Sequence, residues 1–279
     1  MTNWLLGILL GLVQGISEWL PISSKTQVII VSNYLYHFTF QEAYAFGLFL
    51  EAGTFVAALV YFRSEVLKVL KALVGAGDEE GWMLLKYLIV VTLITAALGV
   101  LIYKVVSMTV TGSVLGVPMM VLGLILIGDG ALIHFARGRQ TPKRGLRDLT
   151  IRDLVLVGIA QGVAAFPGVS RSGATVSAML LLGVNPRESF RLSFLALIPA
   201  SVGATITTIL ISKVQITSAI SVITPPVLAV ALVVTVLVGL VLIRVLLRVA
   251  SNPRIALLVI ALGILAILSG VLSFVTGFG

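Results

Sequence analysis

Polar side chains that could do chemistry gather in two short stretches of an otherwise apolar chain. The first reads Gln14-Gly-Ile-Ser-Glu18-Trp-Leu-Pro-Ile-Ser23-Ser24-Lys25-Thr26-Gln27, and the second reads Gln161-Gly-Val-Ala-Ala-Phe-Pro-Gly-Val-Ser170-Arg171-Ser172-Gly-Ala-Thr175. An arginine deep in an apolar chain is costly and usually functional, and the planar fork of Arg171 suits phosphate. Lys25 adds a second positive charge. These residue types indicate a site for a phosphorylated anion.

Each stretch places a proline before a run of hydroxyl residues, which predicts a broken helix followed by a new helix start. Ser23 or Ser24 can cap the first new helix, and Ser170 can cap the second. If both helix starts meet at one depth in a membrane, their free N–H groups and positive dipole ends point at a common anion. Helix capping alone is the alternative role for these serines.

Two carboxylates, Glu18 and Glu51, also lie within apolar segments. Carboxylates beside a phosphate repel it unless a divalent cation lies between them. Mg²⁺ or Ca²⁺, held by one or two carboxylates and by substrate oxygens, meets that requirement. The alternative is that the carboxylates neutralise Arg171 and Lys25 in internal salt bridges.

The elements that position these residues are expected to be membrane helices. Of the 279 residues, 59% are hydrophobic and only 11% are charged, and the mean hydropathy is +1.15. A soluble domain carries about 25% charged residues. We therefore predict an all-α, polytopic membrane protein, a single membrane domain over residues 1–279. Six full spans are expected, and two further apolar segments, 3–36 and 153–184, are broken in the middle. The predicted spans are 41–62, 83–104, 112–135, 188–212, 225–248 and 254–276.

The two broken segments resemble each other, which predicts a duplication. Repeat one would cover 1–135 and repeat two 153–279, joined by a basic loop at 136–152. If both broken segments are re-entrant hairpins, fifteen of the 19 Lys and Arg residues fall on one face, as the positive-inside bias requires. Each half then holds an odd number of spans, so the second repeat is inverted and the hairpins enter from opposite sides. Both termini are expected outside.

The stretch from Gln14 to Gln27 resembles the E-G-x-x-E-[FW]-L-P-[VI]-S-S-x-x-H motif of the bacterial undecaprenyl-diphosphate phosphatases, the BacA/UppP family. The stretch Pro167–Thr175 matches that family's P-G-x-S-R-S-x-x-T motif, and the segment around Ser193 resembles its S-F-L-L-x-x-P motif. The resemblance covers essentially the whole chain. It departs at Gln14, where the family has glutamate, and at Gln27, where it has histidine. Glu51 stands where a glutamine is expected, so the chain is identified as a divergent member.

This resemblance implies an enzyme that converts a polyprenyl diphosphate to the monophosphate with a divalent metal, Mg²⁺ or Ca²⁺. It would recycle the lipid carrier for cell-envelope glycan synthesis in the plasma membrane. The charge bias predicts that the site opens to the outer face. By the family motif, Ser24 is the nucleophile, Arg171 clamps the diphosphate, and Glu18 binds metal or acts as base. Glu51 would share the metal. The remaining motif residues would bind substrate: Gln14, Ser23, Lys25, Thr26, Gln27, Ser170, Ser172 and Thr175.

A different function class stays open at this point. Inverted repeats with broken helices at the midplane are also the architecture of secondary transporters, so the same site could carry a polyprenyl phosphate across the membrane. The net charge of +8 reflects loops on one side of the membrane and not nucleic-acid binding. The expected partners are the lipid and the membrane, and a homodimer is compatible with the sequence.

Overall fold

The computed structural model describes residues 4–20, 22–109, 117–138, 144–166 and 168–249, with a few isolated positions between 260 and 271. Within these residues the chain is helical, with one isolated β-bridge between Arg144 and Val184 and no strand. The all-α prediction is confirmed. The predicted span 254–276, part of the basic loop 136–152, Pro21 and Pro167 lie outside the described residues.

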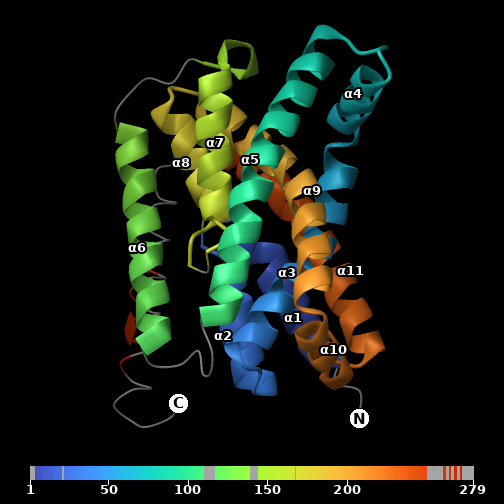
Figure 1. Ribbon diagram of the computed structural model, residues 1–279, viewed down its shortest axis with the longest axis vertical. Helices are drawn as coiled ribbons and strands as arrows, with labels where there is room; N and C mark the ends of the chain where they lie inside the picture. Colours follow the sequence, from blue (N-terminus) through green and yellow to red (C-terminus); the bar gives the residue numbers. More distant parts are fainter. Residues whose placement is uncertain are drawn as a thin grey trace.

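Both predicted broken hairpins are present. The first consists of α1 (Trp4–Ser17) and α2 (Ser24–Tyr36), and the second of α7 (Ile151–Val163) and α8 (Arg171–Leu181). In Figure 1, the first hairpin enters from the end of the molecule that carries the N-terminus, and the second enters from the opposite end. Their tips meet in the middle. This is the placement expected of inverted repeats, while the duplication itself stays a prediction.

Four helices in the described part of the chain are long and apolar enough to cross a membrane. They are α3 (Phe40–Tyr61), α5 (Glu79–Thr109), α9 (Pro186–Ile211) and α11 (Pro225–Val249), and they coincide with four of the predicted spans. A fifth helix, α6 (Val117–Gly138), occupies most of the predicted span 112–135. The total of six spans stays a prediction.

Two short helices lie where the sequence suggested only connections. The first, α4 (Arg63–Leu73), follows α3 almost directly, and α10 (Lys213–Val222) follows α9. Neither is long enough to span a bilayer, so span-length windows do not detect them. In α4, charged residues alternate with leucines that are more than half exposed, such as Leu67 and Leu73. This pattern is typical of a helix lying at the membrane interface.

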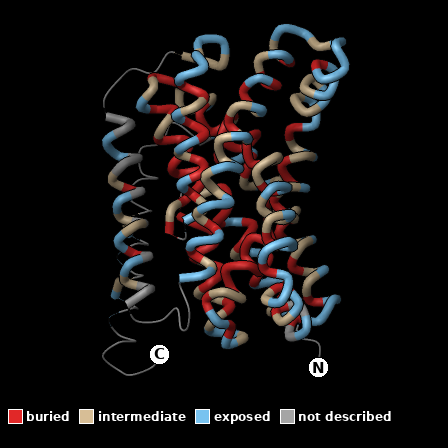
Figure 2. Tube along the Cα trace, viewed as in Figure 1, coloured by how far each residue is buried: buried red, intermediate tan, exposed pale blue. Residues whose placement is uncertain are grey.

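The surface of the helices suits a surrounding of lipid. Large apolar side chains along them are well exposed, including Leu93 at 66% and Leu101 at 60% on α5, and Leu237 at 59% on α11. Figure 2 shows such exposed positions along the outer helices, whereas buried residues gather in the centre. A soluble protein does not expose so much contiguous apolar surface.

Close helix packing holds the first hairpin against α11. A Cβ atom added at Gly7 would lie 2.6 Å from the Val227 carbonyl oxygen, and one at Gly11 would lie 2.5 Å from that of Ala231. Small residues let helix backbones approach in this way, which is a main source of association inside membranes. At the hairpin tip, the fully buried Trp19 packs edge-on against Phe194 of α9, with ring centroids 5.0 Å apart.

Hydrogen bonds join the two hairpin tips. The Leu20 carbonyl of the first hairpin accepts from the hydroxyl of Ser172 at 3.0 Å and from that of Ser170 at 3.5 Å. The Tyr44 hydroxyl of α3 donates to the Ala165 carbonyl of the second hairpin. Backbone carbonyls freed by a helix break must find such partners inside a membrane. These contacts hold both helix starts, α2 and α8, beside one another.

Candidate active site

The break in the first hairpin presents a carboxylate to a serine. Glu18 follows the last residue of α1 and is only 4% exposed. Its Oε2 atom accepts a hydrogen bond from Ser24 Oγ at 2.6 Å and another from Gln14 Nε2 at 2.8 Å. Ser24 is the first residue of α2. A hydroxyl that donates to a carboxylate at this distance has the geometry of a nucleophile beside its base.

The second hairpin supplies the cation that pairs with this carboxylate. Arg171, the first residue of α8, donates from Nη2 to Glu18 Oε1 at 2.6 Å. Its Nε and Nη1 atoms are buried and have no hydrogen-bond partner among the described residues. Buried donors without partners are rare in folded proteins. The guanidinium therefore keeps N–H groups available for an anion.

A second buried ion pair lies close by. Lys25 Nζ is 3.5 Å from Glu51 Oε1, and both side chains are at most 7% exposed. Ser201 of α9 donates to Glu51 Oε2 at 3.3 Å. The internal salt bridges that the sequence left open as an alternative are thus both present. Each of the two carboxylates is paired with one cation, so the four charged side chains together carry no net charge.

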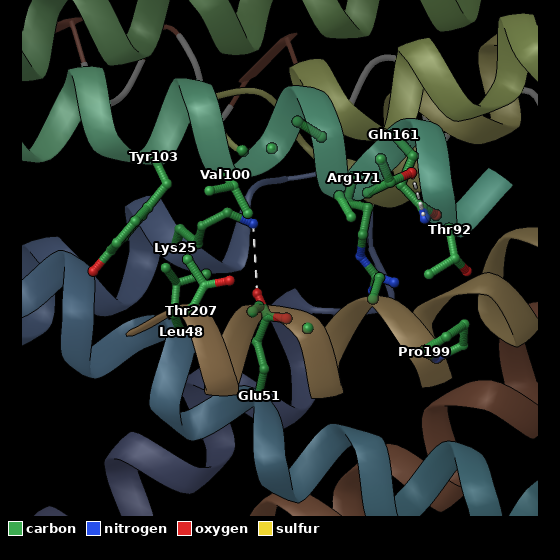
Figure 3. A pocket seen from close by; sticks show the side chains of 18 of the residues that line it. Lys25, Leu48, Glu51, Thr92, Val100, Tyr103, Gln161, Arg171, Pro199 and Thr207 are labelled. Atoms are coloured by element: carbon green, nitrogen blue, oxygen red, sulfur yellow. Dashed lines mark hydrogen bonds and ion pairs between the residues drawn. The ribbon is translucent and has the colours of Figure 1, made fainter. Parts of the chain in front are cut away.

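A cavity lies beside these pairs, lined by residues of α2, α3, α5, α9 and the second hairpin. Lys25, Glu51 and Arg171 line it, and Figure 3 shows their side chains reaching into it from different elements. Glu18 and Ser24 are not among the lining residues. Glu18 is joined to the cavity wall by its bond to Arg171, and Ser24 is bonded to Glu18.

The other predicted site residues mostly hold the hairpins in shape. Thr26 Oγ1 donates to Ser23 Oγ at 3.0 Å, and Gln27 Nε2 donates to the Ile22 carbonyl at 3.2 Å. The predicted serine cap of α2 is wrong, because Ser23 occupies the cap position with φ of 55° and makes no side-chain cap bond. None of Ser23, Thr26 and Gln27 lines the cavity.

The predicted cap of the second hairpin is confirmed. The Ser170 hydroxyl accepts from the Gly173 N–H at 3.2 Å, at the start of α8. Thr175 donates to the Arg171 carbonyl at 2.7 Å and shares a 2.6 Å hydrogen bond with Ser193 of α9. Ser170, Ser172 and Thr175 therefore fix the position of Arg171 and do not themselves line the cavity.

Several cavity residues were not predicted as site residues. Thr92 and Tyr103 line the cavity from α5, where no motif marks them. Ser201 of α9, which bonds Glu51, was not predicted either. Gln161 carried a signal, because it stands in the second hairpin where Gln14 stands in the first. Its Nε2 donates to Thr95 Oγ1 at 3.1 Å, while its Oε1 is buried without a partner among the described residues.

The donor atoms of the site fit a hard divalent cation. Glu18, Glu51 and Ser24 offer oxygen atoms, and the buried Gln14 Oε1 has no hydrogen-bond partner in the part of the chain that the structure describes. Mg²⁺ and Ca²⁺ prefer such oxygen ligands. The described residues contain no cluster of three or more His, Asp or Glu that could hold a metal by itself. A cation bound here would need oxygens from the substrate as well.

The fold and the site together define a membrane-embedded protein with a charged cavity at the meeting point of two broken helical hairpins. The sequence profile described as "Bacitracin resistance protein BacA" matches residues 7–268. An undecaprenyl-diphosphatase of Saccharolobus solfataricus is 51% identical over 274 residues, which cover 98% of each chain. One of Saccharolobus islandicus is 50% identical over 92% of this chain and 91% of its own. One of Pyrobaculum aerophilum is 41% identical over 96% and 97%. The chain belongs to the BacA family.

Proposed function

We propose that this chain is an undecaprenyl-diphosphatase, a membrane hydrolase that converts undecaprenyl diphosphate to the monophosphate and inorganic phosphate. The observation that carries the proposal is the set of contacts joining Ser24, Glu18 and Arg171. A nucleophile, its base and a phosphate-binding cation meet there from both hairpins. Family membership and the names of the relatives support the same reaction.

The chemical step starts with the substrate competing for Arg171. A diphosphate in the cavity accepts from the unpartnered Nε and Nη1 atoms and draws the guanidinium away from Glu18. The freed Glu18 carboxylate then takes the proton of Ser24, with which it already shares a hydrogen bond of 2.6 Å. Loss of the bridge would also let the diphosphate approach Ser24, which is bonded to the same carboxylate.

Ser24 Oγ next attacks the terminal phosphorus. A bond forms between Oγ and this phosphorus, and the bond from phosphorus to the bridging oxygen breaks. Glu18 gives its proton to that oxygen, and undecaprenyl monophosphate leaves. Water then attacks the phosphorylated serine and gives a proton to Glu18, which passes it to Oγ as the bond from Oγ to phosphorus breaks and inorganic phosphate is released. Arg171 and the N-termini of α2 and α8 stabilise charge on the phosphoryl oxygens throughout.

We further propose that a divalent cation, Mg²⁺ or Ca²⁺, assists the reaction. Glu18 and Glu51 would hold it, together with substrate oxygens. When bound, it would neutralise charge on the diphosphate. Lys25, now paired with Glu51, would be released to the substrate. Gln14, Ser23, Thr26 and Gln27 would keep the first hairpin in the binding shape.

The site is proposed to open to the outer face of the plasma membrane, with both termini outside. The support is the charge bias. Helix α4 and the start of α9 lie at one end of the molecule (Figure 1), and they carry basic residues such as Lys68 and Arg187. Basic segments stay on the cytoplasmic side. Transport of the same lipid is not supported by the relatives, and a homodimer stays a prediction.

Phosphate release by the purified protein tests the function directly. Undecaprenyl diphosphate in detergent, with Mg²⁺ or Ca²⁺, should yield inorganic phosphate and the lipid monophosphate in equal amounts. Glu18→Gln should abolish the release. Absence of phosphate release across several prenyl diphosphates and both metals would contradict the proposal.

A further inference from the structure

A second space adjoins the charged cavity and differs from it in character. It is a groove between α4, α5 and α9, and every residue that lines it except Thr92 is apolar. Its walls include Val69 of α4, Ile89 of α5, and Ile198 and Val202 of α9. The reaction described above does not use this groove.

The groove and the cavity share part of their walls. Thr92 and Pro199 line both spaces. In Figure 3, these two residues lie at the same end of the cavity as Arg171, whereas Lys25 and Tyr103 lie at the other end. The apolar groove therefore adjoins the cavity at the end where Arg171 lies.

We propose that this groove binds the isoprene units of the substrate that are nearest to the diphosphate. The inference rests on the proposed function and adds a binding site for the lipid tail. The wall that the groove shares with the cavity beside Arg171 argues for the substrate's own tail, because one molecule with a charged head and an apolar chain could fill both spaces. The tail of an ordinary phospholipid would occupy the groove without any relation to the cavity.

Thr92 marks the point where head and tail meet. Its hydroxyl oxygen is buried and has no hydrogen-bond partner within the described residues. A polar group in this state is costly in a membrane protein unless a ligand completes it. The phosphate oxygens next to the prenyl ester would accept its hydrogen bond. Thr92 thus becomes a residue that positions the substrate at the boundary of its polar and apolar parts.

The location of the groove fixes the direction of the lipid. It lies between α4 and the first half of α5, toward the end of the molecule opposite the N-terminus (Figure 1). A lipid in this groove points its tail toward the α4 end and its head toward the other end. That is the orientation of lipids in the leaflet opposite α4. The substrate can therefore descend to the site without turning over.

The groove acts by orienting the tail and contributes little to affinity. A prenyl chain in the bilayer is already in an apolar environment, so moving it into the groove gains little from the hydrophobic effect. Filling the groove with protein should nevertheless exclude substrates whose tails must enter it. The effect should depend on tail length, which a general loss of structure would not produce.

The test compares Val202→Trp with Ile206→Trp. Both residues lie on α9 and are exposed, at 41% and 53%, but Ile206 lines neither space. For undecaprenyl and farnesyl diphosphate, Val202→Trp should lower kcat/KM about tenfold or more through steric overlap. For isopentenyl diphosphate, whose single unit does not reach the groove, it should change little. Ile206→Trp should leave all three substrates unchanged. Ile89→Trp repeats the test from α5.

The outcomes separate the two proposals. Equal losses for all three substrates, or no loss for any, would overturn the tail groove while the enzymatic function stands. If the unmodified protein hydrolyses none of the three substrates, the proposed enzymatic function is rejected. The tail groove is then tested by a binding measurement. A farnesyl phosphate with a photoreactive group on its first isoprene should then label groove residues of α5 and α9. Labelling confined to other helices would overturn it.

Discussion

Glu18 and Arg171 lie 153 positions apart in the sequence, yet Arg171 Nη2 is 2.6 Å from Glu18 Oε1. Each residue comes from the tip of a different hairpin, so this contact exists only when both tips meet. It holds the carboxylate next to Ser24 and leaves two other nitrogen atoms of the guanidinium unpaired. The ion pair therefore fixes the carboxylate beside Ser24 and leaves guanidinium N–H groups available to bind an incoming anion.

Removal of Arg171 should affect both activity and stability. Arg171→Ala should reduce phosphate release by about a thousandfold or more, since arginines that stabilise a transferring phosphoryl group contribute on this scale. It also leaves the Glu18 carboxylate buried without its cation, which costs about 3–5 kcal/mol of stability. Steady-state kinetics and thermal unfolding in detergent measure the two effects. Arg187→Ala, at an exposed position on α9, is the matched control and should change neither.

A double variant separates these two effects. Arg171→Met combined with Glu18→Gln removes both charges at once, so it should regain more than half of the lost stability. Its activity should remain absent. If stability is not regained, the two side chains do not form the ion pair that the structure shows.

Ser24 should be essential while a neighbouring serine is not. Ser24→Ala removes the proposed nucleophile and should lower kcat by about a thousandfold or more with little change in KM. Ser32 lies on the same helix, and its buried hydroxyl has no partner among the described residues. Ser32→Ala should keep normal activity. Near-normal phosphate release by a well-folded Ser24→Ala protein would exclude this serine as the nucleophile.

A variant of Glu51 tests whether the reaction needs a metal ion that this carboxylate binds. A chelator should stop phosphate release, and Mg²⁺ or Ca²⁺ should restore it. Glu51→Gln removes one proposed ligand charge and should raise the metal concentration for half-maximal activity about tenfold or more. Glu79→Gln, in a carboxylate that is 72% exposed, should leave the metal titration unchanged. A titration that does not shift in Glu51→Gln would show that Glu51 does not bind the metal.

Close packing of the first hairpin gives a prediction for stability alone. A Cβ atom at Gly11 would lie 2.5 Å from the Ala231 carbonyl, so Gly11→Ala must push α1 away from α11. We expect a loss of about 1–3 kcal/mol, seen as a lower unfolding temperature. A Cβ at Gly128 of α6 meets nothing within 4 Å, so Gly128→Ala should be neutral or slightly stabilising. The reverse order of the two variants would contradict the observed packing.

The helix breaks were predictable because they are local features. The proline and hydroxyl residues around Ser24 and Ser170 interrupt apolar runs, and the structure breaks the helices there. The cap of α2 was not predictable in the same way. Ser23 has the residue type of a cap, but its positive φ turns the side chain elsewhere. Backbone conformation at a helix break depends on the opposite hairpin, which single residues do not reveal.

The short helices and the ion-pair partners of the buried carboxylates could not be predicted from the sequence either. The sequence alone marked α4 as a basic connection, since its eleven residues cannot span a bilayer. It also marked Glu51 as an intramembrane carboxylate without choosing between Lys25 and Arg171 as its partner. The structure pairs Glu51 with Lys25 and Ser201, and Glu18 with Arg171. Such pairings depend on how the helices rotate against each other.

The sequence by itself determined that this chain lies in a membrane, breaks two helices, and carries the phosphatase motifs of its family. Those features follow from composition and from spacing within single segments. Only the tertiary structure decided that Arg171 pairs with Glu18 beside Ser24, and that an apolar groove shares Thr92 and Pro199 with the charged cavity. The physical reason is that a cavity or an ion pair belongs to several helices at once. Its geometry arises from packing between segments that are distant in the sequence.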